Sequence, residues 1–217
     1  ESSKIRQIAS ESIVLKTLRV DCEMSNVLDV AFHESTGSWG LGVIKLAKPR
    51  DGDFDLIVKT LGREGARVGK TVVVVDEDID IRDADAVNWA ISYGMQPHRD
   101  ARIVHVDEMS LDYAITAPLT DSVRNPAGKD EGRASVLFID ATRKWPYPPI
   151  SLPARGIMEK AMARWEKEGL PKLELRVPWF GYEAGHWTET DRQEAELALR
   201  GEYFQTGEKL RANRKKL

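Results

Sequence analysis

The 217-residue chain lacks the features that define several large classes of protein. Cys22 is its single cysteine, which excludes a disulfide framework and a thiolate zinc site and indicates a reducing, cytoplasmic setting. No segment approaches the roughly 20 apolar residues that span a bilayer, so we expect no membrane partner. Lysine and arginine number 32 against 35 aspartates and glutamates, and this lack of excess positive charge argues against a nucleic-acid partner.

The hydrophobic pattern that is present predicts an α/β fold, with a mixed or mostly parallel central sheet flanked by helices and a helical C-terminal arm. The run TVVVV at 71–75 is apolar on both faces, which is typical of a central strand covered by helices on each side. The strand at 71–75, the helix at 86–93 and the strand at 101–106 together suggest a right-handed crossover. Further strands are expected at 27–32 and 41–46, as a hairpin, and at 135–139; further helices are expected at 3–18, 54–61 and 155–168.

Two regions differ in character. Residues 1–153 form the expected α/β domain, with a leading helix over 1–20. Residues 154–217 form a helical and aromatic extension, in which a helix is expected to start at Thr190 with Gln193 in a capping box. Burial against another element or another subunit is expected for its aromatic side chains, Trp179, Phe180, Tyr182 and Trp187. Since the chain begins at Glu1, we also expect it to be part of a larger working unit.

Two motifs suggest ligands. The segment GREGARVGKT at 62–71 resembles a phosphate loop, but Gly65 and Gly69 are one residue too close and the motif leads into a strand, so nucleotide hydrolysis is disfavoured. Six carboxylates lie between Asp76 and Asp85. They could bind a hard cation such as Mg²⁺ or Mn²⁺. The favoured alternative is that Asp83 or Asp85 caps the next helix. Gly94 is expected to end that helix as its C′ residue.

Four segments between about residues 25 and 145, taken in their order along the chain, form one further pattern. They are VLDVAFHESTGSWGLGVIKL at 27–46, VVVVDEDIDIRDADAVNWAI at 72–91, PHRD at 97–100 and FIDATRKW at 138–145. Together they resemble the C-terminal domain of the UbiD family of decarboxylases. Because several independent segments match in order, this resemblance is more specific than any single motif.

The resemblance implies a reversible decarboxylation of an aromatic, heteroaromatic or α,β-unsaturated acid, with prenylated FMN, Mn²⁺ and K⁺ as cofactors. In that family the catalytic Glu–Arg–Glu trio and the metal ligands lie on the N-terminal and central domains. No residue of this chain is therefore assigned a catalytic or metal-binding role. The expected partners are those domains or a companion subunit, further copies of the chain in a homo-oligomer, and a small aromatic acid substrate.

In that family, one cationic residue of this domain does bind the cofactor. It lies in the loop before the acidic segment and reaches the flavin phosphate. The candidates are Arg63, Arg67 and Lys70, and we expect Arg63 to bind the cofactor because its R-E-G setting resembles the family's K-A-G. An arginine there would supply a permanent positive charge and a two-pronged hydrogen-bond donor. A second function remains open, in which the chain is a non-catalytic assembly or partner-binding subunit of a carboxylase–decarboxylase complex.

Overall fold

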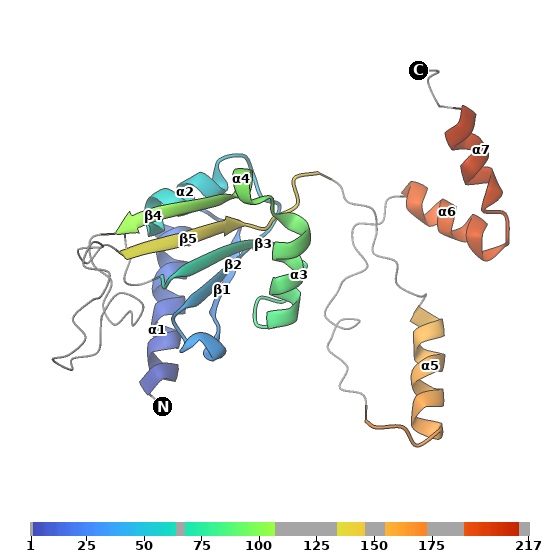
Figure 1. The fold of residues 1–217 in the computed structure, drawn as a ribbon, viewed down its shortest axis with the longest axis horizontal. Helices are drawn as coiled ribbons and strands as arrows, with labels where there is room; N and C mark the ends of the chain where they lie inside the picture. The colour runs from blue at the N-terminus through green and yellow to red at the C-terminus, as the bar shows by residue number, and fades with distance from the viewer. Residues whose placement is uncertain (1, 64–67, 107–133, 146–154, 173–188, 213–217) are drawn as a thin grey trace, which may run out of the picture. The chain divides into compact units, whose positions relative to one another are not determined.

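The first part of the chain folds around one five-stranded sheet of order β1-β2-β3-β5-β4 (Figure 1). The computed structural model describes residues 2–63, 68–106, 134–145, 155–172 and 189–212. Within it the chain divides into two units, residues 1–144 and 145–217. The strands are β1 (Val27–Phe32), β2 (Leu41–Leu46), β3 (Thr71–Asp76), β4 (Ala101–Val106) and β5 (Ala134–Asp140). This sheet, with helices on both faces, confirms the α/β class.

Strand β3 is buried on both faces, as its sequence predicts. Val72 and Val74 lie in one apolar cluster with Ile57 and Leu61 of helix α2 (Asp53–Leu61). The alternate residues Val73 and Val75 lie in a second cluster with residues of helix α3 (Ala84–Gly94). Alternate side chains of a strand point to opposite faces, so α2 and α3 cover opposite faces of the sheet.

The strand directions differ in part from expectation. β2, β3 and β5 are parallel, and the edge strand β1 pairs antiparallel with β2, which confirms the hairpin at 27–46. The expected crossover from 71–75 to 101–106 is wrong: β4 runs antiparallel to β5 at the other edge, and β5 lies between β3 and β4. The parallel crossovers run instead from β2 through α2 to β3, and from β3 through α3, α4 (Pro97–Asp100) and β4 to β5. Burial explains why β5 is central and β4 lies at the edge: Val136 and Phe138 of β5 are fully buried, whereas Ile103 of β4 is exposed.

Helix α1 (Ser2–Lys16), which continues into the π-helical turn η1 (Thr17–Asp21), closes the open edge of β1. The side chain of Gln7 donates to the carbonyl of Phe32 at 2.8 Å, and the carboxylate of Glu11 accepts from the Phe32 N–H at 2.9 Å. Val14 and Leu18 enter the same apolar cluster as α2. An uncovered sheet edge invites pairing with other chains, so these side chains both attach α1 and protect the sheet.

The ends of α3 show one expectation confirmed and one overturned. The Asp83 carboxylate accepts from the Asp85 N–H at 3.0 Å and caps the helix, as expected. Gly94, expected beyond the helix, is its last residue, and Met95 follows in an extended conformation. A Cβ at Gly94 would lie 2.3 Å from the carbonyl oxygen of Ala141. Glycine is therefore needed for close packing against the chain after β5 rather than for a left-handed turn.

The short elements η2 (Glu34–Thr36) and α4 (Pro97–Asp100) complete the first unit. The second unit contains α5 (Arg155–Lys167), α6 (Glu189–Leu199) and α7 (Phe204–Ala212). Because α6 begins at Glu189, the expected cap at Thr190 is wrong, and Gln193 instead donates to Glu189 at 3.4 Å. The predicted aromatic residues from Trp179 to Trp187 lie outside the described residues. None of the helices in the described ranges is long and apolar enough to cross a bilayer.

Replacing Gly94 by alanine should destabilise the first unit, because the new methyl group meets the backbone oxygen of Ala141. We expect the free energy of unfolding to fall by about 1–3 kcal/mol, the usual cost of overpacking. Urea denaturation followed by circular dichroism measures it. Ser92→Ala, two residues earlier on the exposed side of α3, is the matched control and should be nearly neutral. Equal stability of the two variants would show that the close approach has no energetic weight.

Candidate functional site

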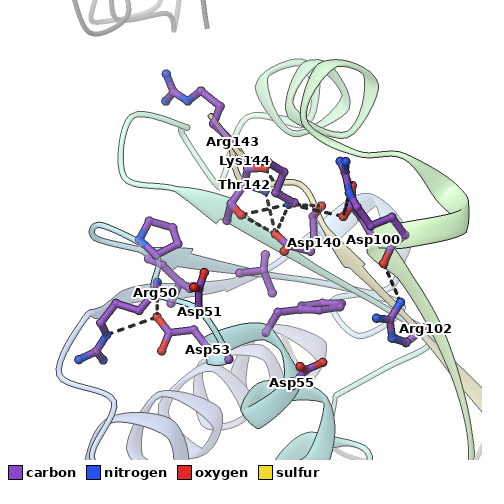
Figure 2. A pocket seen from close by; sticks show the side chains of 16 residues that line it. Arg50, Asp51, Asp53, Asp55, Asp100, Arg102, Asp140, Thr142, Arg143 and Lys144 are labelled. Atoms are coloured by element: carbon purple, nitrogen blue, oxygen red, sulfur yellow. Dashed lines mark hydrogen bonds and ion pairs between the residues drawn. The ribbon is translucent and has the colours of Figure 1, made fainter. Parts of the chain in front are cut away.

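A polar pocket of about 420 Å³ opens where β2, β3 and β5 end (Figure 2). The carboxyl ends of parallel strands are where open α/β sheets bind ligands. The loop before α2, the loop after β5 and the α4–β4 junction surround it. Five cations and five carboxylates line it: Arg50, Arg99, Arg102, Arg143, Lys144, Asp51, Asp53, Asp55, Asp100 and Asp140.

The loop after β5 is organised around Asp140. One oxygen of its carboxylate accepts from the N–H and the hydroxyl of Thr142, at 3.0 and 2.6 Å. The ammonium of Lys144 lies 2.9 Å from the same oxygen and also donates to the Thr142 carbonyl at 2.8 Å. Because Asp140 ends a buried strand, these bonds turn the loop back on itself and hold Lys144 inside the pocket.

Asp100 connects this loop to the edge strand. Its side chain is 4% exposed, and it receives two hydrogen bonds of 2.7 Å from the guanidinium of Arg99. The N–H of Gln96 donates to it at 2.8 Å, and the Lys144 ammonium lies 3.9 Å away. Burial by itself would raise the pKa of Asp100. The hydrogen bonds from Arg99 and Gln96 and the charges of Lys144 and Arg99 outweigh burial and hold this pKa below its ordinary value.

Arg143 leaves the same loop in another direction, away from Asp140 (Figure 2). Its backbone N–H donates to Asp76 at 2.8 Å, its Nε donates to the same oxygen at 3.3 Å, and its Nη2 pairs with Asp78. Burial raises the pKa of Asp76, and Arg143 offsets that effect only in part. For Arg143, burial would lower the pKa, but Asp78 and Asp76 raise it. Two members of the predicted acidic cluster thus neutralise one arginine.

The loop before α2 forms the opposite wall. Asp53, which is 8% exposed, accepts from the side chain of Asn26 at 2.6 Å and from the Arg50 N–H at 2.9 Å. Gly52 precedes it with φ +88°, a left-handed conformation in which a Cβ would be strained. The guanidinium of Arg50 lies 3.6 Å from Asp53 and also donates to Asn26.

Most charges of the pocket are therefore paired with one another. Asp51 and Asp55 have no cationic partner among the described residues, and Arg102 donates only to the carbonyls of Arg99 and Ala101, at 2.7 and 3.0 Å. Within the described ranges no group of three or more His, Cys, Asp or Glu side chains is placed to hold a metal ion. The arrangement can bind a polar ligand or a charged segment of protein.

The predicted site residues lie elsewhere. Arg63 is exposed in the turn after α2, at the amino-terminal end of β3 and so at the other end of the sheet from the pocket. Lys70 immediately precedes β3, and its N–H donates to the Gly40 carbonyl at 3.2 Å. Arg67 lies outside the described residues. The assignment of Arg63 to the flavin phosphate stays a prediction.

Other sequence candidates have structural contacts. His33 is buried, and its Nε2 lies 2.8 Å from the Ile81 carbonyl. The Cys22 thiol lies 3.5 Å from the hydroxyl of Thr60. Sequence reasoning identified the DATRK segment only as part of a family pattern and missed the pocket it lines. The feature of the sequence that could have revealed the pocket is a run of polar and charged residues directly after a buried strand. One such run follows β5, and another follows β2.

Comparison with known proteins identifies relatives. The family described as "3-octaprenyl-4-hydroxybenzoate carboxy-lyase C-terminal domain" matches residues 6–140. An uncharacterized protein of Aeropyrum pernix is 34% identical over 111 residues, covering 46% of this chain and 20% of its own length. This chain therefore spans a small part of that relative.

Among solved structures, the UbiD-class enzyme HmfF from Pelotomaculum thermopropionicum, in complex with FMN, is 26% identical with a TM-score of 0.52. That likeness covers 71% of this chain and 32% of HmfF. The apo 3,4-dihydroxybenzoic acid decarboxylase AroY of Klebsiella pneumoniae is 19% identical with a TM-score of 0.51, over 73% of this chain and 33% of AroY. At that identity the likeness to AroY concerns the fold alone.

The depressed pKa of Asp100 predicts how stability depends on pH. The ionised carboxylate stabilises the fold at neutral pH, and this contribution is lost as the pH falls below about 4 and through the folded-state pKa. Asp100→Asn should lower the free energy of unfolding at pH 7 by about 1–3 kcal/mol. The difference from the unmodified protein should shrink toward pH 3. Urea denaturation across this range measures it, and Asp55→Asn, in the same pocket but exposed, should change little at any pH.

Proposed function

The chain belongs to the UbiD family, and from that membership we propose that it forms the C-terminal domain of a flavin-dependent carboxy-lyase. The reaction is the reversible decarboxylation of an aromatic, heteroaromatic or α,β-unsaturated acid. The observation that carries the proposal is the extent of the family match, which runs over residues 6–140 and includes all five strands. The match thus covers a complete folded unit rather than an isolated motif.

The cofactor assignment has separate support. HmfF, 26% identical to this chain, is a UbiD-class enzyme in complex with FMN. We propose prenylated FMN as the group that accepts electrons while CO₂ leaves. The pocket residues are largely paired with one another, and the described ranges offer no metal-binding cluster. The Mn²⁺ and K⁺ sites and the proton-transferring groups are therefore proposed to lie on the flavin-binding part of the enzyme, in the same polypeptide or in a companion subunit.

The end of the sheet that would face the flavin is the one that carries Arg63. Helix α2 begins beside the pocket at Asp53 and ends at Leu61, and nine residues of helix cover about 13 Å. Arg63 follows its end, is exposed and has no acidic partner among the described residues. A guanidinium in that state can donate two hydrogen bonds to a phosphate. In this proposal the pocket at the opposite end of the sheet does not hold the flavin.

The second unit supports an assembly role within the same proposal. Leu199, Tyr203 and Leu210 of this unit are 64–75% exposed, and Leu197 is its only buried apolar residue in the described ranges. The exposure of these large apolar side chains is the observation that supports an assembly role. We propose that the extension from residue 154 packs on a neighbouring subunit of a homo-oligomer. A purely structural subunit, without a part in catalysis, is the competing function that exposure of these residues also favours.

Activity of the complete enzyme tests the function. The complete enzyme means this chain together with the flavin-binding part, whether one polypeptide or two. Loaded with prenylated FMN, it should release CO₂ from at least one member of a panel of aromatic, heteroaromatic and α,β-unsaturated acids. This chain alone should release none. CO₂ release by the chain alone would place the reactive groups here, and activity of the flavin-binding part without this chain would favour the purely structural subunit.

Arg63→Ala should weaken flavin binding to the complete enzyme roughly 10- to 100-fold, because it removes a charge-assisted hydrogen bond. Fluorescence titration with FMN measures the dissociation constant without requiring turnover. Arg63→Lys should retain most of the affinity. Lys59→Ala removes an exposed cation one turn earlier on α2 and should not change the affinity. An equal loss of FMN affinity in the Lys59 and Arg63 variants would show that Arg63 acts only through its positive charge and not through a specific contact with the phosphate.

A further inference from the structure

Helix α1 has large apolar residues on two opposite sides. Val14 and Leu18 face the core and are 3% and 0% exposed. Ile5, Ile8 and Ile13 of α1 and Val20 of η1, which together we call the outer stripe, are 70%, 57%, 42% and 64% exposed. A surface helix normally has one apolar side, and a helix that is apolar all round is normally buried all round.

The rotation of α1 about its axis is fixed by polar bonds on its inner side. Gln7 is 3% exposed and donates to the Phe32 carbonyl, and Glu11 accepts from the Phe32 N–H. Arg82, from the loop before α3, donates to both oxygens of Glu11 at 3.2 and 3.4 Å. Turning the helix to bury the isoleucines would break these bonds and expose the edge of β1. Among the described residues of the first unit, none covers the outer stripe.

The stripe has the dimensions of an interface. It extends over about 15 residues, or about 23 Å of helix, and exposes on the order of a few hundred Å² of apolar surface, the size of the largest apolar patch on a typical monomer, which is often functional. Arg6 and Arg19 flank it. Both are exposed, and neither pairs with an acidic residue in the described part of the chain.

We propose that the outer stripe of α1 is the surface on which the flavin-binding part of the enzyme docks; this inference rests on the proposed function. This chain covers only 32% of HmfF, so the larger part of such an enzyme is the available occupant. The basic flanks favour a partner that carries carboxylates around an apolar groove. A second copy of α1 would instead bring like charges together. A membrane surface is disfavoured because the stripe has no aromatic residue among its members.

Thiol labelling measures whether the stripe is covered. In a Cys22→Ser background, Ile8→Cys places one thiol on the stripe. Asn88→Cys places the control thiol on the exposed side of α3, which covers the other face of the sheet. Assembly of the complete enzyme should slow maleimide labelling at position 8 by roughly tenfold or more and leave position 88 unchanged.

Each other result overturns the inference in a distinguishable way. Equal labelling of position 8 in the isolated chain and in an active complete enzyme would refute the docking surface while the function stands. Protection in the isolated chain that increases with its concentration would assign the stripe to a second copy, and protection independent of concentration would assign it to residues of the same chain. Protection only on addition of anionic vesicles would assign it to a membrane. A complete enzyme that neither binds FMN nor releases CO₂ would refute the proposed function and this inference with it.

Substitution provides an independent measurement. Ile5→Glu combined with Ile8→Glu should weaken binding of the chain to the flavin-binding part roughly 100-fold, the effect of disrupting central apolar contacts. Both side chains are exposed, so the thermal unfolding of the isolated chain should not change. Ile5→Leu combined with Ile8→Leu keeps the apolar surface and should bind normally. Unchanged binding by the Glu variant, with its fold intact, would refute the docking surface.

Discussion

The burial of β3 on both faces is the constraint on which the rest of the first unit depends. Val72 to Val75 are at most 2% exposed, so helices must cover both faces and polar residues can occur only at the strand ends. At the carboxyl end these polar residues are brought together with those that follow β2 and β5. The pocket is therefore a consequence of the parallel core, and most of its charges pair with one another in a partly buried setting.

Most of those charges are engaged in ion pairs. Arg143 is held by Asp76 and Asp78, and Lys144 is held by Asp140. Such pairing fixes the positions of the side chains that carry these charges. In the proposed function, this domain supports a reaction centre that lies on another part of the enzyme. The two ends of the sheet therefore differ: one is rich in paired charges, and the other carries the exposed Arg63.

Helix α1 links the sheet edge to the outside of the unit. Burial would raise the pKa of Glu11, but hydrogen bonds from Phe32, Gln7 and Arg82 and the charge of Arg82 hold this pKa below its ordinary value. The same carboxylate therefore attaches the helix to β1 and to the loop before α3. A partner seated on the outer stripe would contact an element that is rigidly bound to both.

The sequence by itself determined the local elements: the apolar run of β3, the Asp83 cap, the α2 and α5 segments, and an ordered pattern specific enough to identify the family. These depend on residues close together in the chain, whose spacing sets helix and strand periodicity. Tertiary structure alone decided that β4 runs antiparallel at the edge, that Gly94 packs against Ala141, and that Gln7 and Glu11 face inward while isoleucines face outward. Each of these depends on a partner distant in sequence. The backbone groups at a sheet edge and the charged groups at strand ends bind to whichever residues the tertiary structure places beside them.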